Sequence, residues 1–157
     1  MTLQELYEKL GGNYEGILER FGKEERIQRF VLLFLKDDSY DLFLSEFEKQ
    51  NISEAFRAIH TLKGVCMNLG FEALFAPVNE ITEALRREDL QKGEEWKESL
   101  VSEYKRHIEL IRKYEREIEL QMHFTKKMRS MMKKQGELHL DIVLRRYNCS
   151  RTLRVRR

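Results

Sequence analysis

Three residues within one five-residue stretch have the types and the spacing to support transfer of a phosphoryl group: His60, Lys63 and Gly64. On a helix, residues three and four positions apart share a face. Neutral imidazole carries a nitrogen lone pair near neutral pH and can act as a nucleophile. A lysine ammonium can stabilise negative charge on a transferring group. Phosphoryl transfer requires mainly such positioning and charge stabilisation.

Gly64 is the most informative of the three, because a glycine inside a helix costs about 1 kcal/mol relative to alanine. Its missing side chain leaves space beside His60 for the close approach of a partner or of a phosphoryl group. Each of the three residues, taken alone, is more often an ordinary surface residue. Their combination at this spacing favours phosphotransfer chemistry.

The segment around His60 has the pattern of a long helix packed on a core. Apolar residues recur at alternating three- and four-residue steps and predict a buried seam of Ile52, Ala55, Ile59, Leu62, Cys66 and Leu69. Asn51 and Ser53 are of the types that open helices, and Gly70 is of the type that ends them. At 100° per residue, His60 lies roughly 120° from the centre of the seam and should face outward. Cys66 is expected to be a small buried residue.

Five further segments show helical periodicity, and no segment shows the alternation of a strand. Thr2 can cap the first of them, and Gly11 and Gly12 can end it. The predicted helices cover residues 2–10, 24–36, 40–49, 72–87 and, after a loop at 88–93, residues 94–118. Amphipathic helices joined by short loops predict an all-α protein with an up-and-down bundle.

Charge is distributed unevenly, although the whole chain carries a formal net charge of only +2. Residues 1–120 hold 18 basic and 25 acidic residues, a net of −7, whereas residues 121–157 hold 11 and 2, a net of +9. We therefore expect a bundle over residues 1–118 and a basic tail over 119–157, first a helical extension and then poorly ordered. Such a tail can contact nucleic acid or anionic lipid, but a solvated tail is favoured. An altered reading frame at the end of the gene would give the same composition.

The stretch from His60 to Gly70, HTLKGVCMNLG, resembles the signature of the histidine-containing phosphotransfer (HPt) domain family. In that signature an H-x-L-K-G core is followed by a leucine-glycine helix end. The resemblance covers roughly residues 3–116 and implies four antiparallel helices with a short N-terminal helix over one end. The chain departs from the family in two ways. Members often carry a glutamine near the exposed face of the histidine, whereas the neighbours here are Phe56, Arg57 and Met67, and the basic tail has no counterpart in a minimal HPt domain.

The resemblance also implies a function in two-component signalling. His60 would accept a phosphoryl group from the aspartyl phosphate of one response-regulator receiver domain and donate it to another. Lys63 would stabilise the phosphoryl group, and Gly64 would give the partner access. The receiver would contact the surface around His60, formed by Phe56, Arg57, Met67 and Asn68. The Mg²⁺ used in such transfers belongs to the receiver, so no metal site and no cofactor is expected in this chain.

Other classes of protein are disfavoured by the sequence. No glycine-rich phosphate loop or ATP-binding motif is present, so we expect a phosphotransfer protein without kinase activity rather than an enzyme. The longest apolar run, Phe30 to Leu35, is six residues, and no signal peptide is visible, so a cytoplasmic monomer without a membrane span is expected. His107, His123 and His139 lack a second potential metal ligand at a suitable spacing. Two alternatives stay open: a receiver-docking protein without phosphotransfer and, less favoured, a nucleic-acid binder that uses the tail.

Overall fold

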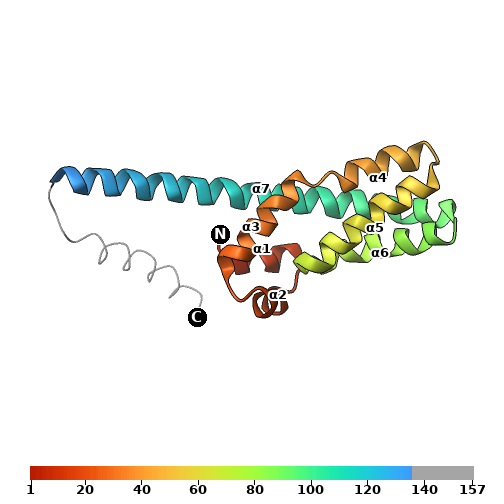
Figure 1. Ribbon diagram of the computed structural model, residues 1–157, viewed down its shortest axis with the longest axis horizontal. Helices are drawn as coiled ribbons and strands as arrows, with labels where there is room; N and C mark the ends of the chain where they lie inside the picture. The colour runs from red at the N-terminus through yellow and green to blue at the C-terminus, as the bar shows by residue number, and fades with distance from the viewer. Residues whose placement is uncertain (136–157) are drawn as a thin grey trace. The chain divides into compact units, whose positions relative to one another are not determined.

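The computed structural model describes residues 1–135, and every regular element within them is helical (Figure 1). In chain order these elements are α1 (Leu3–Leu10), α2 (Tyr14–Phe21), α3 (Glu24–Leu33), the 3₁₀ helix η1 (Phe34–Lys36), α4 (Ser39–Glu48), α5 (Ile52–Leu69), α6 (Glu72–Arg86) and α7 (Leu90–Gln135). The chain divides into two compact units, Met1–Arg116 and Glu117–Arg157. The all-α fold expected from the sequence is confirmed, and a domain boundary after residue 118 stays a prediction.

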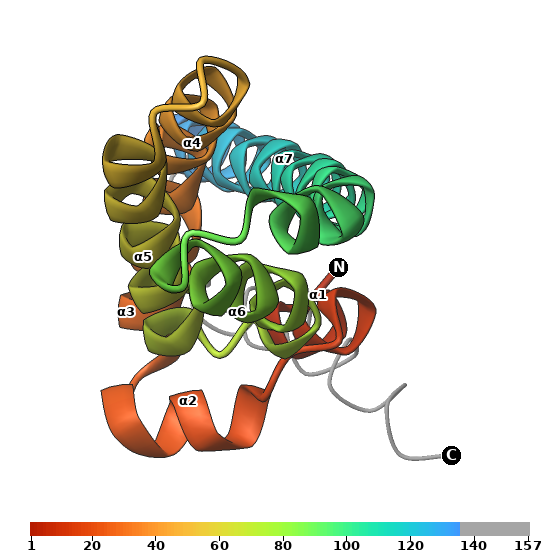
Figure 2. The same cartoon turned by 90° about the vertical axis from the view of Figure 1, so that its right-hand side faces the viewer.

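Within the first unit, α5 packs against both α4 and α6. Figure 2 shows these three helices and the beginning of α7 running alongside one another. Short connections between successive helices favour this side-by-side packing. Each of these helices contributes fully buried apolar side chains to the core, among them Phe43, Ile59, Leu62, Leu74, Ile81 and Leu100. Burial of this apolar surface is the main stabilising contribution to the bundle.

The C-terminal end of α5 is held in place by the two N-terminal helices. The hydroxyl of Tyr7 donates a buried hydrogen bond of 2.9 Å to the carbonyl of Leu69. Gly70 ends the helix in the left-handed conformation, with φ +63°, and a Cβ there would lie 2.6 Å from Cγ1 of Ile17. A side chain at this position is therefore excluded both by the backbone and by the neighbouring helix. α1 and α2 thus position the end of the helix that carries His60.

Helix α2 was not expected from the sequence. It begins after Asn13, whose side-chain oxygen accepts a hydrogen bond of 2.9 Å from the backbone N–H of Gly16. Ile17 is the one buried residue of this helix. Tyr14, Ile17, Leu18 and Phe21 do recur at helical spacing, but the pattern covers only eight residues, and the helix was missed.

The start of α7 differs from the prediction as well. A loop was expected over residues 88–93, but the helix begins at Leu90. The side chain of Asp89 accepts a hydrogen bond of 2.9 Å from the backbone N–H of Lys92 and so caps the first turn. Gly93 was expected in the loop, yet it lies within the helix beside the ring of Phe47. A Cβ on Gly93 would lie 3.1 Å from Cε2 of that ring. The glycine serves close packing rather than a turn.

Two other helix ends lie where the sequence predicts them, but their local structure differs from the prediction. The segment predicted as one helix over 24–36 is α-helical to Leu33 and tightens into η1 over its last turn. Asn51 precedes α5 as expected, but its side chain makes no capping bond. Its amide instead donates to Glu46 at 2.8 Å.

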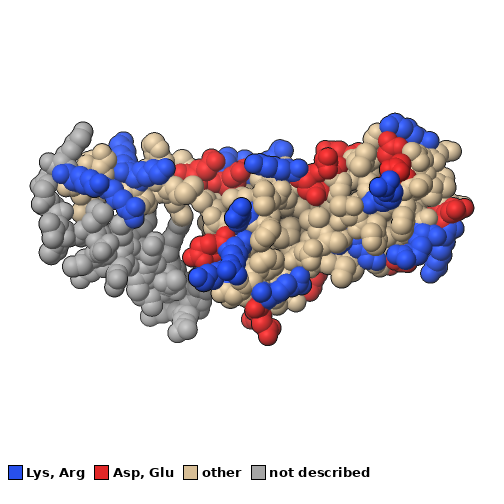
Figure 3. Space-filling view, viewed as in Figure 1, with Lys and Arg blue, Asp and Glu red and all other residues tan. Residues whose placement is uncertain are grey.

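The described part of the second unit consists of the later turns of α7. Basic side chains are visible along this part of the helix (Figure 3). Its exposed basic residues include Lys126, Lys127, Arg129 and Lys133. No helix among residues 1–135 is both long and apolar enough to span a membrane. Two predictions, the poor order of the chain end and the absence of a metal ligand near His139, concern residues 136–157, which lie outside the described part.

Candidate functional site

His60 lies on the solvent side of α5, as its helical phase predicts. One face of this helix is buried in the bundle through Ala55, Ala58, Ile59, Leu62, Cys66 and Leu69, whereas His60 itself is exposed. The burial of the opposite face fixes the rotation of the helix. The imidazole is therefore presented to solvent by a rigid element rather than by a loop.

The residues predicted around His60 all fall on the same side of α5. With 100° per residue, Phe56, Arg57, Lys63, Gly64, Met67 and Asn68 lie within about 80° of His60 on the helix circumference. Arg57, Met67 and Asn68 are exposed, and Met67 has an exposed fraction of 55%. The structure thus brings the predicted residues together on one accessible face.

Phe56 forms one wall of the site. Its ring lies nearly parallel to the imidazole of His60, with ring centroids 5.6 Å apart and an interplanar angle of 26°. The guanidinium carbon of Arg86, on α6, lies 5.6 Å from the centroid of the Phe56 ring. This distance is within the range of a cation–π interaction. Arg86 is therefore a further cation beside this face, and it was not among the residues predicted from the sequence.

Lys63 is bound to an acidic residue of the neighbouring helix. Its ammonium nitrogen lies 3.1 Å from Oε1 of Glu83, and its side chain is only 17% exposed. Oε2 of the same carboxylate lies 3.2 Å from Nε of Arg86. The hydrogen bond from Lys63, together with the charge of Arg86, lowers the pKa of the Glu83 carboxyl below its ordinary value. Glu83 was also absent from the predicted site, because a sequence does not show which residues of α6 face α5.

Gly64 borders open space. A Cβ built on this residue would meet no atom within 4 Å outside the helix's own backbone. Packing within the first unit therefore does not require glycine here, in contrast to Gly70. The helix bears the cost of about 1 kcal/mol without an internal packing reason, and the open space lies beside the histidine.

Arg57 and Asn68 have local partners. Arg57 forms an ion pair of 3.0 Å with Glu54 one turn earlier. The guanidinium of Arg20, on α2, is within 3.5 Å of the carbonyl oxygens of Met67 and Asn68. These backbone contacts link α2 to the end of α5, and they leave the side chains of Met67 and Asn68 exposed.

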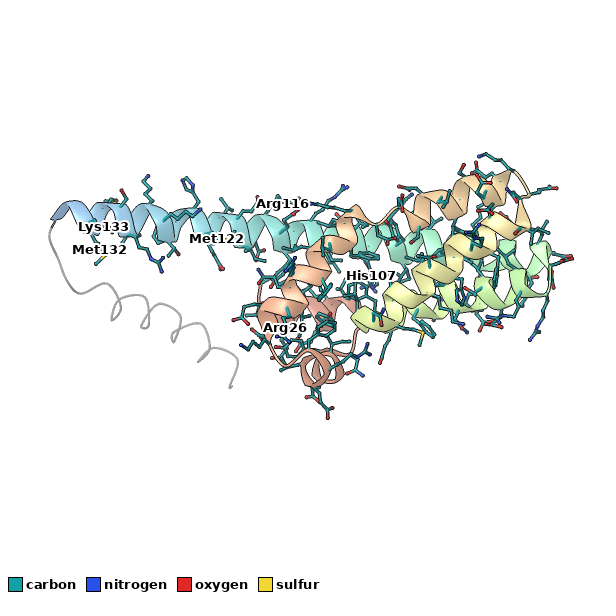
Figure 4. The ribbon with its side chains drawn as sticks, viewed as in Figure 1. Arg26, His107, Arg116, Met122, Met132 and Lys133 are labelled. Carbon is teal, nitrogen blue, oxygen red and sulfur yellow. The ribbon has the colours of Figure 1, made fainter. Side chains whose placement is uncertain are left out.

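Two other titratable residues are buried away from this face. His107 is fully buried in the first unit (Figure 4); its Nδ1–H donates to the carbonyl of Glu103 at 2.8 Å, and its ring packs edge-on against Phe71. Burial lowers the pKa of His107 to about 4. Burial likewise raises the pKa of the Cys66 thiol to about 12. Neither residue can serve as a surface nucleophile.

No group of three potential metal-ligating side chains occurs within the described residues. The groups around His60 are instead an aromatic wall, the cations Arg57, Lys63 and Arg86, and an open glycine. Together they define a class of protein: a helical bundle that presents a single histidine, flanked by positive charge, on a rigid helix.

The comparison with protein families identifies the group to which the chain belongs. The family model described as the Hpt domain matches residues 24–116, more than half of the chain. The protein is a member of the Hpt domain family. No match was found among curated proteins or solved structures. The matched segment begins at α3, so α1 and α2 lie outside it.

Membership gives the general activity. Hpt domains carry phosphoryl groups on histidine in two-component signalling and interact with the receiver domains of response regulators. They are phosphotransfer carriers rather than kinases.

Proposed function

We propose that this protein is a phosphorelay intermediate and that His60 is the residue that carries the phosphoryl group. One observation carries the proposal: His60 is exposed on α5, whose other face is buried. Among the described histidines, His107 is buried and His123 lies on the second unit, outside the matched segment. His60 alone stands within the HTLKG sequence that resembles the family signature.

In the forward step, an imidazole nitrogen of His60 attacks the phosphorus of an aspartyl phosphate on a receiver. The N–P bond forms, the P–O bond to the carboxylate breaks, and the electron pair of that bond leaves with the carboxylate. The reverse step returns the phosphoryl group to the aspartate of a second receiver. Lys63 lies one turn from His60 and supplies positive charge for the phosphoryl oxygens.

Transfer requires a surface to which the receiver binds, in addition to the nucleophile. We assign this surface to the partly buried Phe56 and to the exposed residues Arg57, Met67 and Asn68 around His60. Support comes from the exposed fraction of Met67 and from the open space at Gly64. An exposed methionine is a flexible apolar contact that adapts to a partner's shape. Exchange with one receiver at a time needs only one copy of the chain, and we therefore also propose a monomer that works in the compartment of the receivers, the cytoplasm.

The test is phosphoryl transfer from radiolabelled receiver domains to the purified full-length chain. The wild type should acquire label that is stable in base and labile in acid, as expected for phosphohistidine. His60→Gln should acquire none and should retain its helical content by circular dichroism. His123→Gln is the matched control, because His123 is an exposed histidine outside the matched segment, and it should label as the wild type does.

Two outcomes would contradict the proposal. Binding of a receiver without label on the wild type would leave a docking protein without phosphotransfer. Label that persists in His60→Gln would place the phosphorylated residue elsewhere in the chain.

A further inference from the structure

Glu83 occupies an unexpected position for an acidic residue, beside a site that receives a negatively charged group. Its two carboxylate oxygens contact two cations beside that site, Lys63 at 3.1 Å and Arg86 at 3.2 Å. The Glu83 side chain is 37% exposed, so burial in the core does not account for its position. The carboxylate remains ionised at neutral pH, since the hydrogen bond from Lys63 lowers its pKa.

The two cations differ in how they are held. Arg86 has a second attachment, because its guanidinium also lies over the ring of Phe56, 5.6 Å from the centroid. Lys63 is a flexible point charge on a four-carbon stem, three residues from His60 on the same face of α5. Of the two, Lys63 is the cation that can change partners when a phosphoryl group arrives.

A phosphoryl group on His60 would compete with Glu83 for Lys63. A phosphoryl group carries up to two negative charges and three strong acceptor oxygens, and so it is a stronger partner for an ammonium group than one carboxylate oxygen. In the unphosphorylated protein Lys63 keeps its ion pair with Glu83, whereas in the phosphorylated protein that pair is weakened. An interaction present in only one of two states shifts the equilibrium toward that state by its free energy.

We propose that Glu83 is a positioning residue that holds Lys63 in the unphosphorylated protein and thereby weakens the retention of the phosphoryl group on His60. This inference rests on the proposed function of His60. It adds a residue that acts through Lys63 and sets how readily the protein donates its phosphoryl group to a receiver. A carrier that bound the group too tightly would accept it but would not pass it on.

The first measurement is the equilibrium between phosphorylated receiver and phosphorylated full-length chain, for the wild type and for Glu83→Gln. The substitution removes the charge and keeps the shape. It should shift the equilibrium toward phosphohistidine by about two- to fivefold, the range expected for a partly exposed ion pair. Glu95→Gln is the matched control, because Glu95 forms a lysine ion pair of 2.9 Å with Lys92 on α7 of the same unit, and its equilibrium should equal that of the wild type.

A double-mutant cycle with Lys63→Met tests whether Glu83 acts through Lys63. In the Lys63→Met background the effect of Glu83→Gln should disappear, since the cation that changes partners is absent. The same shift in both backgrounds would mean that Glu83 merely repels the phosphoryl group, and the proposed route would be overturned. Thermal unfolding of each variant verifies that the bundle is intact.

A second readout does not depend on receivers. Phosphoramidate transfers its phosphoryl group to histidine and releases ammonia, and ³¹P NMR then reports the pKa of the phosphoryl group on the full-length chain. A nearer ammonium favours the dianion, so Glu83→Gln should lower this pKa relative to the wild type. If Glu83→Gln changes neither the pKa of the phosphoryl group nor the transfer equilibrium, while the wild type transfers normally, the role of Glu83 is refuted and the proposed function of His60 stands. Absence of transfer by the wild type would refute the proposed function, and the role of Glu83 with it.

Discussion

Replacing Gly64 with alanine is expected to stabilise the protein, although the position lies in the candidate site. A Cβ at Gly64 meets no atom within 4 Å, so the new methyl group clashes with nothing in the bundle. The helix then gains the difference between glycine and alanine in a helix interior, about 1 kcal/mol. For a protein of this size, that gain corresponds to a rise in Tm of about 2–8 °C, measurable by circular dichroism.

Gly22 provides a matched control for this measurement. A Cβ there also meets nothing within 4 Å, but the residue ends α2 with φ +71°, in the left-handed region. Alanine in that conformation is strained by about 1–2 kcal/mol. Gly22→Ala should therefore lower Tm while Gly64→Ala raises it, although both substitutions add the same methyl group to open space.

The functional half of the prediction uses a larger side chain. Gly64→Gln places a long side chain beside His60, where the receiver must approach, and should slow transfer from a receiver by about 100-fold, because small misplacements of reacting groups have effects of that order. The fold should be retained. Gly64→Gln transferring at the wild-type rate would refute the interpretation of Gly64 as an access residue, and a destabilised Gly64→Ala would show that the helix requires glycine there for packing.

Two further predictions concern stability at low pH and the receiver surface. Burial lowers the pKa of His107 from 6.5 to about 4. As the pH falls, His107 is therefore protonated in the unfolded chain before it is protonated in the folded protein. The free energy of unfolding should decrease between about pH 6.5 and 4, by about 3 kcal/mol in total. Urea unfolding at pH 7 and pH 4.5 should show most of this loss in the wild type, and His107→Leu should lack it; equal losses in the two proteins would contradict the assignment. Met67→Ala should weaken receiver binding by up to about tenfold, because Met67 is 55% exposed on the proposed contact surface. Its unfolding free energy should change by less than about 0.5 kcal/mol, and an unchanged Kd would remove Met67 from that surface.

The sequence alone was sufficient to predict most of the helices and the orientation of His60. The apolar seam of α5 has so regular a period that the outward direction of His60 follows from helix geometry, and the exposed histidine agrees with it. The ends of α1 and α5 were likewise predictable, because Gly11 and Gly70 both adopt the left-handed conformation that favours glycine. These features are local: each depends on residues within a few turns of one another.

The tertiary structure alone determined which groups surround the histidine. Glu83 and Arg86 belong to α6, about twenty residues further along the chain, and their contacts with Lys63 and Phe56 exist only because α6 packs against α5. Helix α2 is only eight residues long, so the helical spacing of Tyr14, Ile17, Leu18 and Phe21 is a weak signal for it. The first turn of α7 was missed because a glycine that packs against Phe47 looks like a loop residue. Periodicity records how one helix meets a core, but it does not record which residues of a second helix lie beside a given residue of the first. The outward direction of His60, the proposed phosphoryl carrier, could therefore be predicted from the sequence, whereas the charges around it depend on the packing of two helices.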